Sequence, residues 1–155
     1  MSFRFSGLSM ERFSGLLALS DSALRARGIL RLNAEPGYPC RVSLRDADPG
    51  ESVLLLNYEH QSGPGPFRAS GPIFVREAGE DAGLLPENEV PDVVRTRLVS
   101  VRAYDGDGMM VEADVTEGSR VEGLIETLFG HESVAYLHVH FARRGCYACR
   151  VERPS

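Results

Sequence analysis

The sequence contains no lysine and no long hydrophobic run. All 17 basic residues are arginine, scattered along a chain whose formal net charge is −5. A nucleic-acid-binding protein usually presents a clustered basic face, so nucleic acid is not an expected partner. The longest aliphatic run, residues 53–56, is far shorter than the roughly 18 residues of a membrane span, and the first ten residues lack a signal-peptide hydrophobic region. We therefore expect no membrane association and a cytoplasmic location.

Cysteine is also scarce, with only Cys40, Cys146 and Cys149. An odd number in a chain without an export signal argues against a disulfide framework and for reduced thiols. Cys146 and Cys149 form a C-x-x-C pair, but redox pairs of this kind sit at a helix N-terminus. The surrounding residues have the pattern of a strand, which predicts that the two thiols point to opposite faces. Cys149 and Cys40 are therefore interpreted as core residues, and Cys146 is the candidate reactive thiol.

The chain has 155 residues, which suits one domain, residues 1–155, with a single core. Hydrophobic residues make up 43% and charged residues 25%, a balance that excludes disordered and low-complexity proteins. The order of short elements predicts a single α+β domain with a largely antiparallel, mixed-order sheet of about seven to nine strands and about three helices on one side.

Hydrophobic periodicity locates these elements. Helices are expected at residues 10–18 with Ser9 as N-cap, between Ser20 and Gly28, at 91–97, and at 119–129; strands are expected at 3–5, 29–34, 40–44, 52–60 and 72–77. Strand 52–60 is apolar on both faces at its start, which predicts a central position in the sheet. Ser119 and Glu122 have the spacing of a capping box.

Strand 40–44 and the residue after it place Arg41, Ser43 and Arg45 on one face. This alternation fits an anion site, but an ordinary solvated or salt-bridged face is the better interpretation.

Two hairpins follow from side-chain parity, because facing residues must lie on the same side of a sheet. In the first hairpin, Val101 is predicted opposite Ala113, with the odd-numbered residues from Met109 to Val115 buried and the turn at 106–108. In the second, Leu137, Val139 and Phe141 are predicted to share a face with Tyr147, Cys149 and Val151, with the turn at 143–145. Gly108 and Gly145 supply the left-handed residue of each turn.

The opposite face of the second hairpin gathers the candidate site. His138 is predicted opposite Arg150 and His140 opposite Ala148, with Cys146 diagonally next to His140. An H-x-H pair on a strand puts two imidazoles on one side about 7 Å apart, an arrangement used by β-sheet metal sites. A thiol beside an imidazole is also the minimum unit of an activated nucleophile.

Two hypotheses follow. The first is a small-molecule-binding or catalytic domain with a small anionic ligand and a transition metal such as zinc. Its catalytic residues are Cys146, His140 and His138, its ligand-binding residues are Arg150, Asn57 and His60, and its metal ligands are His138, His140 and Cys146, with His60 as an alternative ligand. The second is a non-catalytic binding or self-association module with no active site, in which this polar face belongs to a homodimer interface.

Several blocks of the sequence resemble the domain-of-unknown-function 1203 family of uncharacterised bacterial proteins. The blocks are PGYPCRVSLRDADPGE, VLLLNYEHQ, GPIFVRE, RLVSVRAYDGDGMMVEADV and YLHVHFARRGCYACRVE. The resemblance spans nearly the whole chain to Glu152. Relatives often have asparagine after the H-x-H unit, where this chain has Phe141. The resemblance implies a small bacterial protein, and it carries no activity, cofactor or catalytic residues that could be transferred to this chain.

Overall fold

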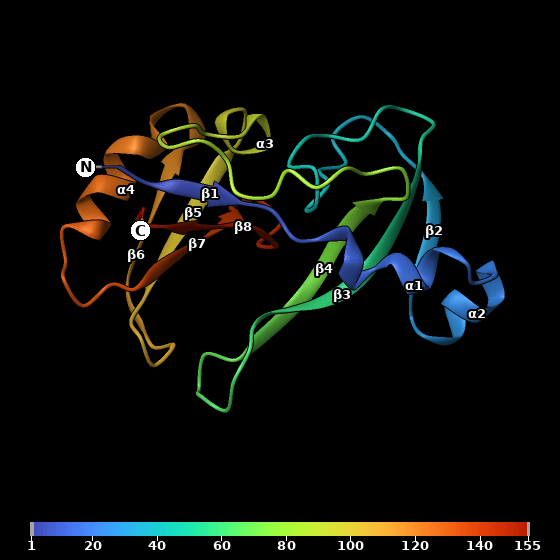
Figure 1. Ribbon diagram of the computed structural model, residues 1–155, viewed down its shortest axis with the longest axis horizontal. Helices are drawn as coiled ribbons and strands as arrows, with labels where there is room; N and C mark the ends of the chain where they lie inside the picture. Colours follow the sequence, from blue (N-terminus) through green and yellow to red (C-terminus); the bar gives the residue numbers. More distant parts are fainter. Residues whose placement is uncertain (1, 155) are drawn as a thin grey trace.

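The computed structural model describes residues 2–154, which form eight β-strands and four α-helices (Figure 1). The predicted α+β class is confirmed. In chain order the elements are β1 (Arg4–Ser6), the 3₁₀ turn η1 (Met10–Arg12), α1 (Ser14–Leu17), α2 (Asp21–Ala26), β2 (Leu30–Asn33), β3 (Ser52–Gln61), β4 (Ala69–Arg76), α3 (Asp92–Arg95), β5 (Leu98–Tyr104), β6 (Met110–Glu117), the 3₁₀ turn η2 (Gly118–Arg120), α4 (Val121–Phe129), β7 (Tyr136–Phe141) and β8 (Tyr147–Glu152). None of the helices in the described residues combines the length and the apolar character of a membrane span.

The strands divide into two antiparallel sheets. One has five strands in the order β1-β8-β7-β5-β6, and the other has three in the order β2-β3-β4. Strand β3 is central in the smaller sheet, as its apolar start predicted. Helices α3 and α4 lie at the five-stranded sheet, and α1 and α2 lie at the three-stranded sheet (Figure 1).

The larger core lies between the five-stranded sheet and helix α4. Val121, Ile125 and Leu128 of the helix are buried against strands β5, β7 and β8. The predicted capping box is wrong, because Ser119 lies in η2 and α4 begins at Val121 without a side-chain cap. The chain passes close to α3 at Gly118, in the 3₁₀ turn that precedes α4.

The segment 40–44 is a tight turn and not the predicted strand. Leu44 has a positive φ of 55°, and only isolated bridges join Pro39 to Asp46 and Cys40 to Phe74. The solvated face expected here is also wrong at one position, because the side chain of Arg41 is 2% exposed. Polar and apolar residues alternate in this segment as they do in a strand, but the segment folds into a turn that lies between the two sheets.

The first hairpin has the predicted turn but a different register. Gly108 adopts φ 79°, yet Val101 pairs with Asp114 and not with Ala113. A bulge between Ala103 and Tyr104 shifts the pairing by one residue, and a one-residue shift moves every β6 side chain to the opposite face. The odd-numbered residues of β6 are therefore not in the core, and Val115 is 53% exposed on this edge strand.

Gly118 offers a sharp test of this packing. A Cβ atom at Gly118 would lie 1.6 Å from the carbonyl oxygen of Val94, so Gly118→Ala should lower the free energy of unfolding by about 3 kcal/mol. Gly123 in α4 is the matched control, since its Cβ would meet no atom within 4 Å. Gly123→Ala should raise stability by up to about 1 kcal/mol through helix propensity. Urea unfolding of both variants measures this, and equal effects would contradict the close approach.

Candidate metal site

Strand β7 carries His138 and His140 between β5 and β8, on the face away from α4. His138 lies opposite Arg150, as predicted, but a bulge after Val139 pairs His140 with Tyr147 in place of Ala148. The bulge brings Tyr147 onto the histidine face and turns Ala148 into the apolar core, so the predicted apolar position of Tyr147 is wrong. An aromatic ring thus occupies the position next to the H-x-H pair.

His60, near the end of β3 in the other sheet, completes a three-histidine cluster. Its ring centroid lies 4.8 Å from that of His140 and 6.0 Å from that of His138. One ring nitrogen from each of the three residues lies within 4.8 Å of the other two. The Tyr147 ring stacks on His60 at a centroid distance of 5.4 Å and fixes its orientation. The cluster therefore joins the two sheets through imidazole side chains.

Hydrogen bonding leaves buried ring nitrogens of this cluster without a partner. The Nδ1 atom of His140 lies 3.0 Å from the carbonyl oxygen of Gly145, an acceptor that requires Nδ1 to carry the proton. The Nε2 atom of His140 is then an unprotonated acceptor. Among residues 2–154, this Nε2 and the Nδ1 atoms of His60 and His138 are buried without a hydrogen-bond partner. Buried polar atoms are rarely left unpaired, so this group calls for an external partner.

Burial keeps these imidazoles neutral. Loss of solvation lowers the pKa of His138 to about 3 and that of His140 to about 4, with repulsion from the neighbouring histidine and arginine side chains adding to the effect at His138. Burial also lowers the pKa of His60, with a smaller contribution from Arg102. Neutral imidazole is the form that binds a metal ion.

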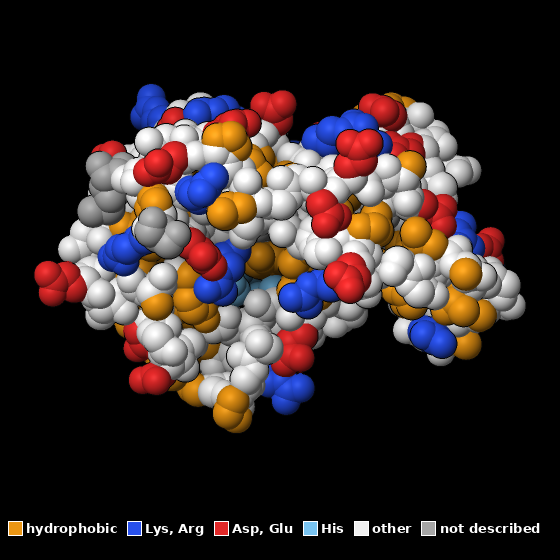
Figure 2. All heavy atoms as spheres, in the orientation of Figure 1, with side chains coloured by type: hydrophobic (Ala, Val, Ile, Leu, Met, Phe, Trp, Pro, Cys, Tyr) orange, Lys and Arg blue, Asp and Glu red, His pale blue; other side chains and the backbone are white. Residues whose placement is uncertain are grey.

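A cavity of about 650 Å³ opens onto His60 and His138. Arg150 of β8 and Arg12 at the end of η1 also line it, as do the rings of Tyr58 and Tyr147. The Arg150 guanidinium lies 4.0 Å from the centroid of Tyr136, which holds it against the sheet. In Figure 2 the pale blue histidine side chains lie at the bottom of a hollow with arginine side chains on either side. A ligand entering this hollow would meet histidine nitrogens and positive charge together.

The structure gathers some of the predicted site residues and separates others. His60, His138 and Arg150 line the cavity, and His140 lies beside it in the histidine cluster. Cys146 does not join them: its Sγ accepts a hydrogen bond from Arg41 at 3.1 Å, and it lines a different cavity. The cause is the bulge: it moves Tyr147 onto the histidine face, so that Cys146, the residue before it, points to the opposite face. Asn57 is exposed and lies outside the cavity lining, because residues 57 and 60 of a strand point to opposite faces.

Sequence reasoning missed Tyr147 and Arg12 as lining residues. The bulge that redirects Tyr147 has no local sequence signature. Arg12 reaches the cavity from η1, and its guanidinium lies 5.8 Å from the Tyr58 ring centroid. Nothing in the local sequence around Arg12 indicates that it contacts a strand about 46 residues later, because this contact is set by tertiary packing.

A family model described as a protein of unknown function, DUF1203, matches residues 37–153. The chain belongs to this family. The matched region contains all three histidines as well as Cys146 and Arg150. No curated protein and no solved structure matches the chain.

The lowered histidine pKa values predict acid sensitivity of the metal-free protein. An unfolded histidine has a pKa of about 6.5, so the unfolded chain binds more protons than the native one below that pH. The stability contributed by neutral His138 and His140 is complete above about pH 6.5 and is lost as the pH falls. Between pH 7 and pH 5, the free energy of unfolding should fall by about 2 kcal/mol for each of these two histidines.

Urea unfolding in a buffer with chelator measures this dependence. His138→Gln should remove about 2 kcal/mol of the loss between pH 7 and pH 5, because one buried imidazole no longer takes up a proton on unfolding. His131 is exposed, so His131→Gln is the matched control and should leave the slope unchanged. An unaltered slope in His138→Gln would contradict the neutral, buried state of that ring.

Proposed function

We propose that His60, His138 and His140 bind a divalent transition metal such as zinc, and that the centre serves a small-molecule enzyme acting on an anionic substrate. The observation that carries the proposal is a group of three imidazoles, two buried and one half-buried, with ring nitrogens within 4.8 Å of one another. Each ring has a buried nitrogen without a hydrogen-bond partner, and His60 and His138 line a cavity. A metal ion would satisfy these lone pairs at once, which hydrogen bonds from the surrounding side chains do not.

The donor set favours a catalytic over a structural metal. Structural zinc sites are closed by four protein ligands, whereas three histidines leave a position for water or substrate. Zinc–nitrogen bonds of about 2.0–2.1 Å place tetrahedral ligands about 3.4 Å apart, so the three rings would turn inward by side-chain rotation on binding. When bound, such an ion lowers the pKa of a coordinated water towards 7 and supplies a nucleophile for hydrolysis.

The second part of the proposal concerns the His140 ring. Its Nδ1–H bond to the Gly145 carbonyl is the outer hydrogen bond that metal-binding histidines usually make, because it fixes the tautomer and the ring orientation. Gly145 adopts φ 80° in the hairpin turn, which brings its carbonyl oxygen to the ring. The turn after β7 thus prepares Nε2 of His140 for a ligand.

Charge around the cavity supports an anionic substrate. Three neutral ligands would leave the full charge of a divalent ion uncompensated, and Arg12 and Arg150 add two positive groups. The lining carboxylate, Glu59, forms an ion pair with Arg68. Arg150 forms an ion pair with Glu152, so part of its hydrogen-bonding capacity is already used. A carboxylate or phosphate group would be attracted to the open side of the metal.

The metal hypothesis predicts about one zinc or cobalt(II) per chain in untagged protein after equilibrium dialysis. His60→Ala should weaken binding by more than the roughly 10–100-fold typical of losing an outer hydrogen-bond partner, because it removes a ligand. His131→Ala is the matched histidine control and should bind normally. Cys146→Ser should also bind normally, since the thiol lies in another cavity.

Metal analysis of these variants separates the two hypotheses. Equal, weak binding by wild type and His60→Ala would contradict a metal centre and favour the non-catalytic module. In that case changes at the histidines should alter only the assembly of the protein, which light scattering measures.

The anion component has its own test in the cobalt-loaded protein. Inorganic phosphate should change the visible absorption spectrum by occupying the open position, and Arg150→Gln should raise the required phosphate concentration about tenfold, equivalent to about 1.4 kcal/mol. Arg45 lies outside this cavity, so Arg45→Gln should leave the titration unchanged. If phosphate does not change the visible absorption spectrum of the cobalt-loaded wild type, this result would contradict an accessible coordination position.

A further inference from the structure

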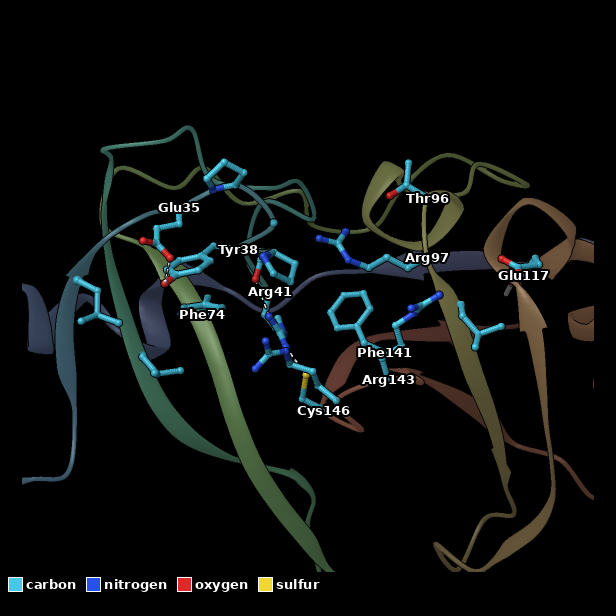
Figure 3. Close-up of a pocket in the computed structure, with 17 residues that line it drawn as sticks. Glu35, Tyr38, Arg41, Phe74, Thr96, Arg97, Glu117, Phe141, Arg143 and Cys146 are labelled. Carbon is cyan, nitrogen blue, oxygen red and sulfur yellow. Dashed lines mark hydrogen bonds between the residues drawn. The ribbon is translucent and has the colours of Figure 1, made fainter.

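A second and larger cavity, of about 740 Å³, lies away from the histidines, and Cys146 lines it together with Arg41 and Arg97 (Figure 3). The guanidinium centres of Arg41 and Arg97 both lie 5.0 Å from the ring centroid of Phe141. Arg143 and Arg144 also line this cavity. Four arginines from three parts of the chain therefore line one cavity.

Arg41 is a buried charge without a charged partner. Its Nε donates to the Tyr147 carbonyl at 2.8 Å, one terminal nitrogen donates to the Pro39 carbonyl at 2.6 Å, and the other donates to Cys146 Sγ at 3.1 Å. Within residues 2–154 no carboxylate forms an ion pair with it. A buried guanidinium is usually paired with an anion, because desolvating an unpaired charge is costly.

The other charged residues of the cavity do not supply this anion. Arg97 forms an ion pair with Asp46 at 2.8 Å, and its positive charge repels that of Arg41. The two lining carboxylates, Glu35 and Glu117, are drawn at opposite ends of the cavity in Figure 3, with the arginines between them. The centre of the cavity is therefore positive.

One wall of the cavity is apolar. Tyr38 and Phe74 stack at a centroid distance of 4.2 Å on the side of the three-stranded sheet, and Leu32 and Leu55 extend this wall. A carboxylate or phosphate alone would use only the arginine side of such a space. A molecule with an acidic group and an apolar body would fill both sides.

We propose that this cavity is a second binding site, one that takes a small organic anion with its acidic group at Arg41 and Arg97 and its apolar body against Tyr38 and Phe74. Cys146, partly exposed at the cavity floor, is then the thiol that a bound anion approaches. The site is independent of the metal proposal, since the two cavities have no lining residue in common.

Alkylation of Cys146 reads out anion recognition directly. Iodoacetate and iodoacetamide alkylate a thiol by the same mechanism. The sulfur attacks the methylene carbon and forms the carbon–sulfur bond, iodide leaves with its electron pair, and the thiol proton passes to solvent. Only iodoacetate is an anion. The ratio of the two rates at Cys146, followed by peptide mass spectrometry, should exceed the ratio for N-acetylcysteine at least tenfold.

Variants and competitors complete the test. Arg97→Gln should lower this rate ratio at least threefold, whereas Arg45→Gln, in the nearby turn but outside the cavity lining, should not change it. Benzoate should slow the alkylation and its neutral analogue benzamide should not. Cys149 and Cys40 are buried, and their lack of labelling verifies that each variant is folded.

Three results would overturn the proposal. One is a rate ratio at Cys146 equal to that of N-acetylcysteine, and another is equal protection by benzoate and benzamide. The third is protection by inorganic phosphate without protection by benzoate, which would indicate a site for the bare oxyanion. Because the experiment uses metal-free protein, none of these results depends on the histidine centre.

Discussion

The side chain of Arg41 holds the two sheets together. It lies in the turn that precedes β3, and its guanidinium reaches the Tyr147 carbonyl and the Cys146 sulfur at the start of β8. Its backbone amide donates to Phe74 of β4, and its carbonyl accepts from Leu8. Hydrogen bonds from a charged group contribute about 1.5–3 kcal/mol each when both partners are buried. Arg41 thus contacts residues that line both cavities.

The histidine cluster depends on this arrangement. His138 and His140 belong to the five-stranded sheet and His60 to the three-stranded sheet, so the cluster exists only while the sheets keep their relative position. The bulge in β7–β8 adds Tyr147 to the same face, where it stacks on His60. A pair of imidazoles set by strand periodicity becomes a three-histidine site because tertiary packing supplies the third ring.

Local periodicity predicted the face of the second hairpin that carries the two histidines. The shared face of His138 and His140 follows from the two-residue repeat of a strand, and the left-handed Gly145 follows from the loop length. The position of Cys146 could not be predicted, since a bulge changes the face of every residue beyond it and leaves no composition signal. The burial of Arg41 was equally hidden, because alternation with polar neighbours imitates a strand when tertiary contacts in fact fold the segment into a turn. Two predicted members of the candidate site, Cys146 and Asn57, therefore lie apart from the histidines of the hairpin.

X-ray absorption at the zinc edge of the loaded protein tests the three-histidine centre most directly, because it distinguishes nitrogen from sulfur ligands. The account predicts nitrogen and oxygen neighbours at about 2.0–2.1 Å, outer-shell scattering from imidazole rings, and no sulfur at about 2.3 Å. The spectrum of the Cys146→Ser variant should be the same. A sulfur neighbour, or a shell of oxygen atoms without imidazole scattering, would contradict a metal centre built from His60, His138 and His140.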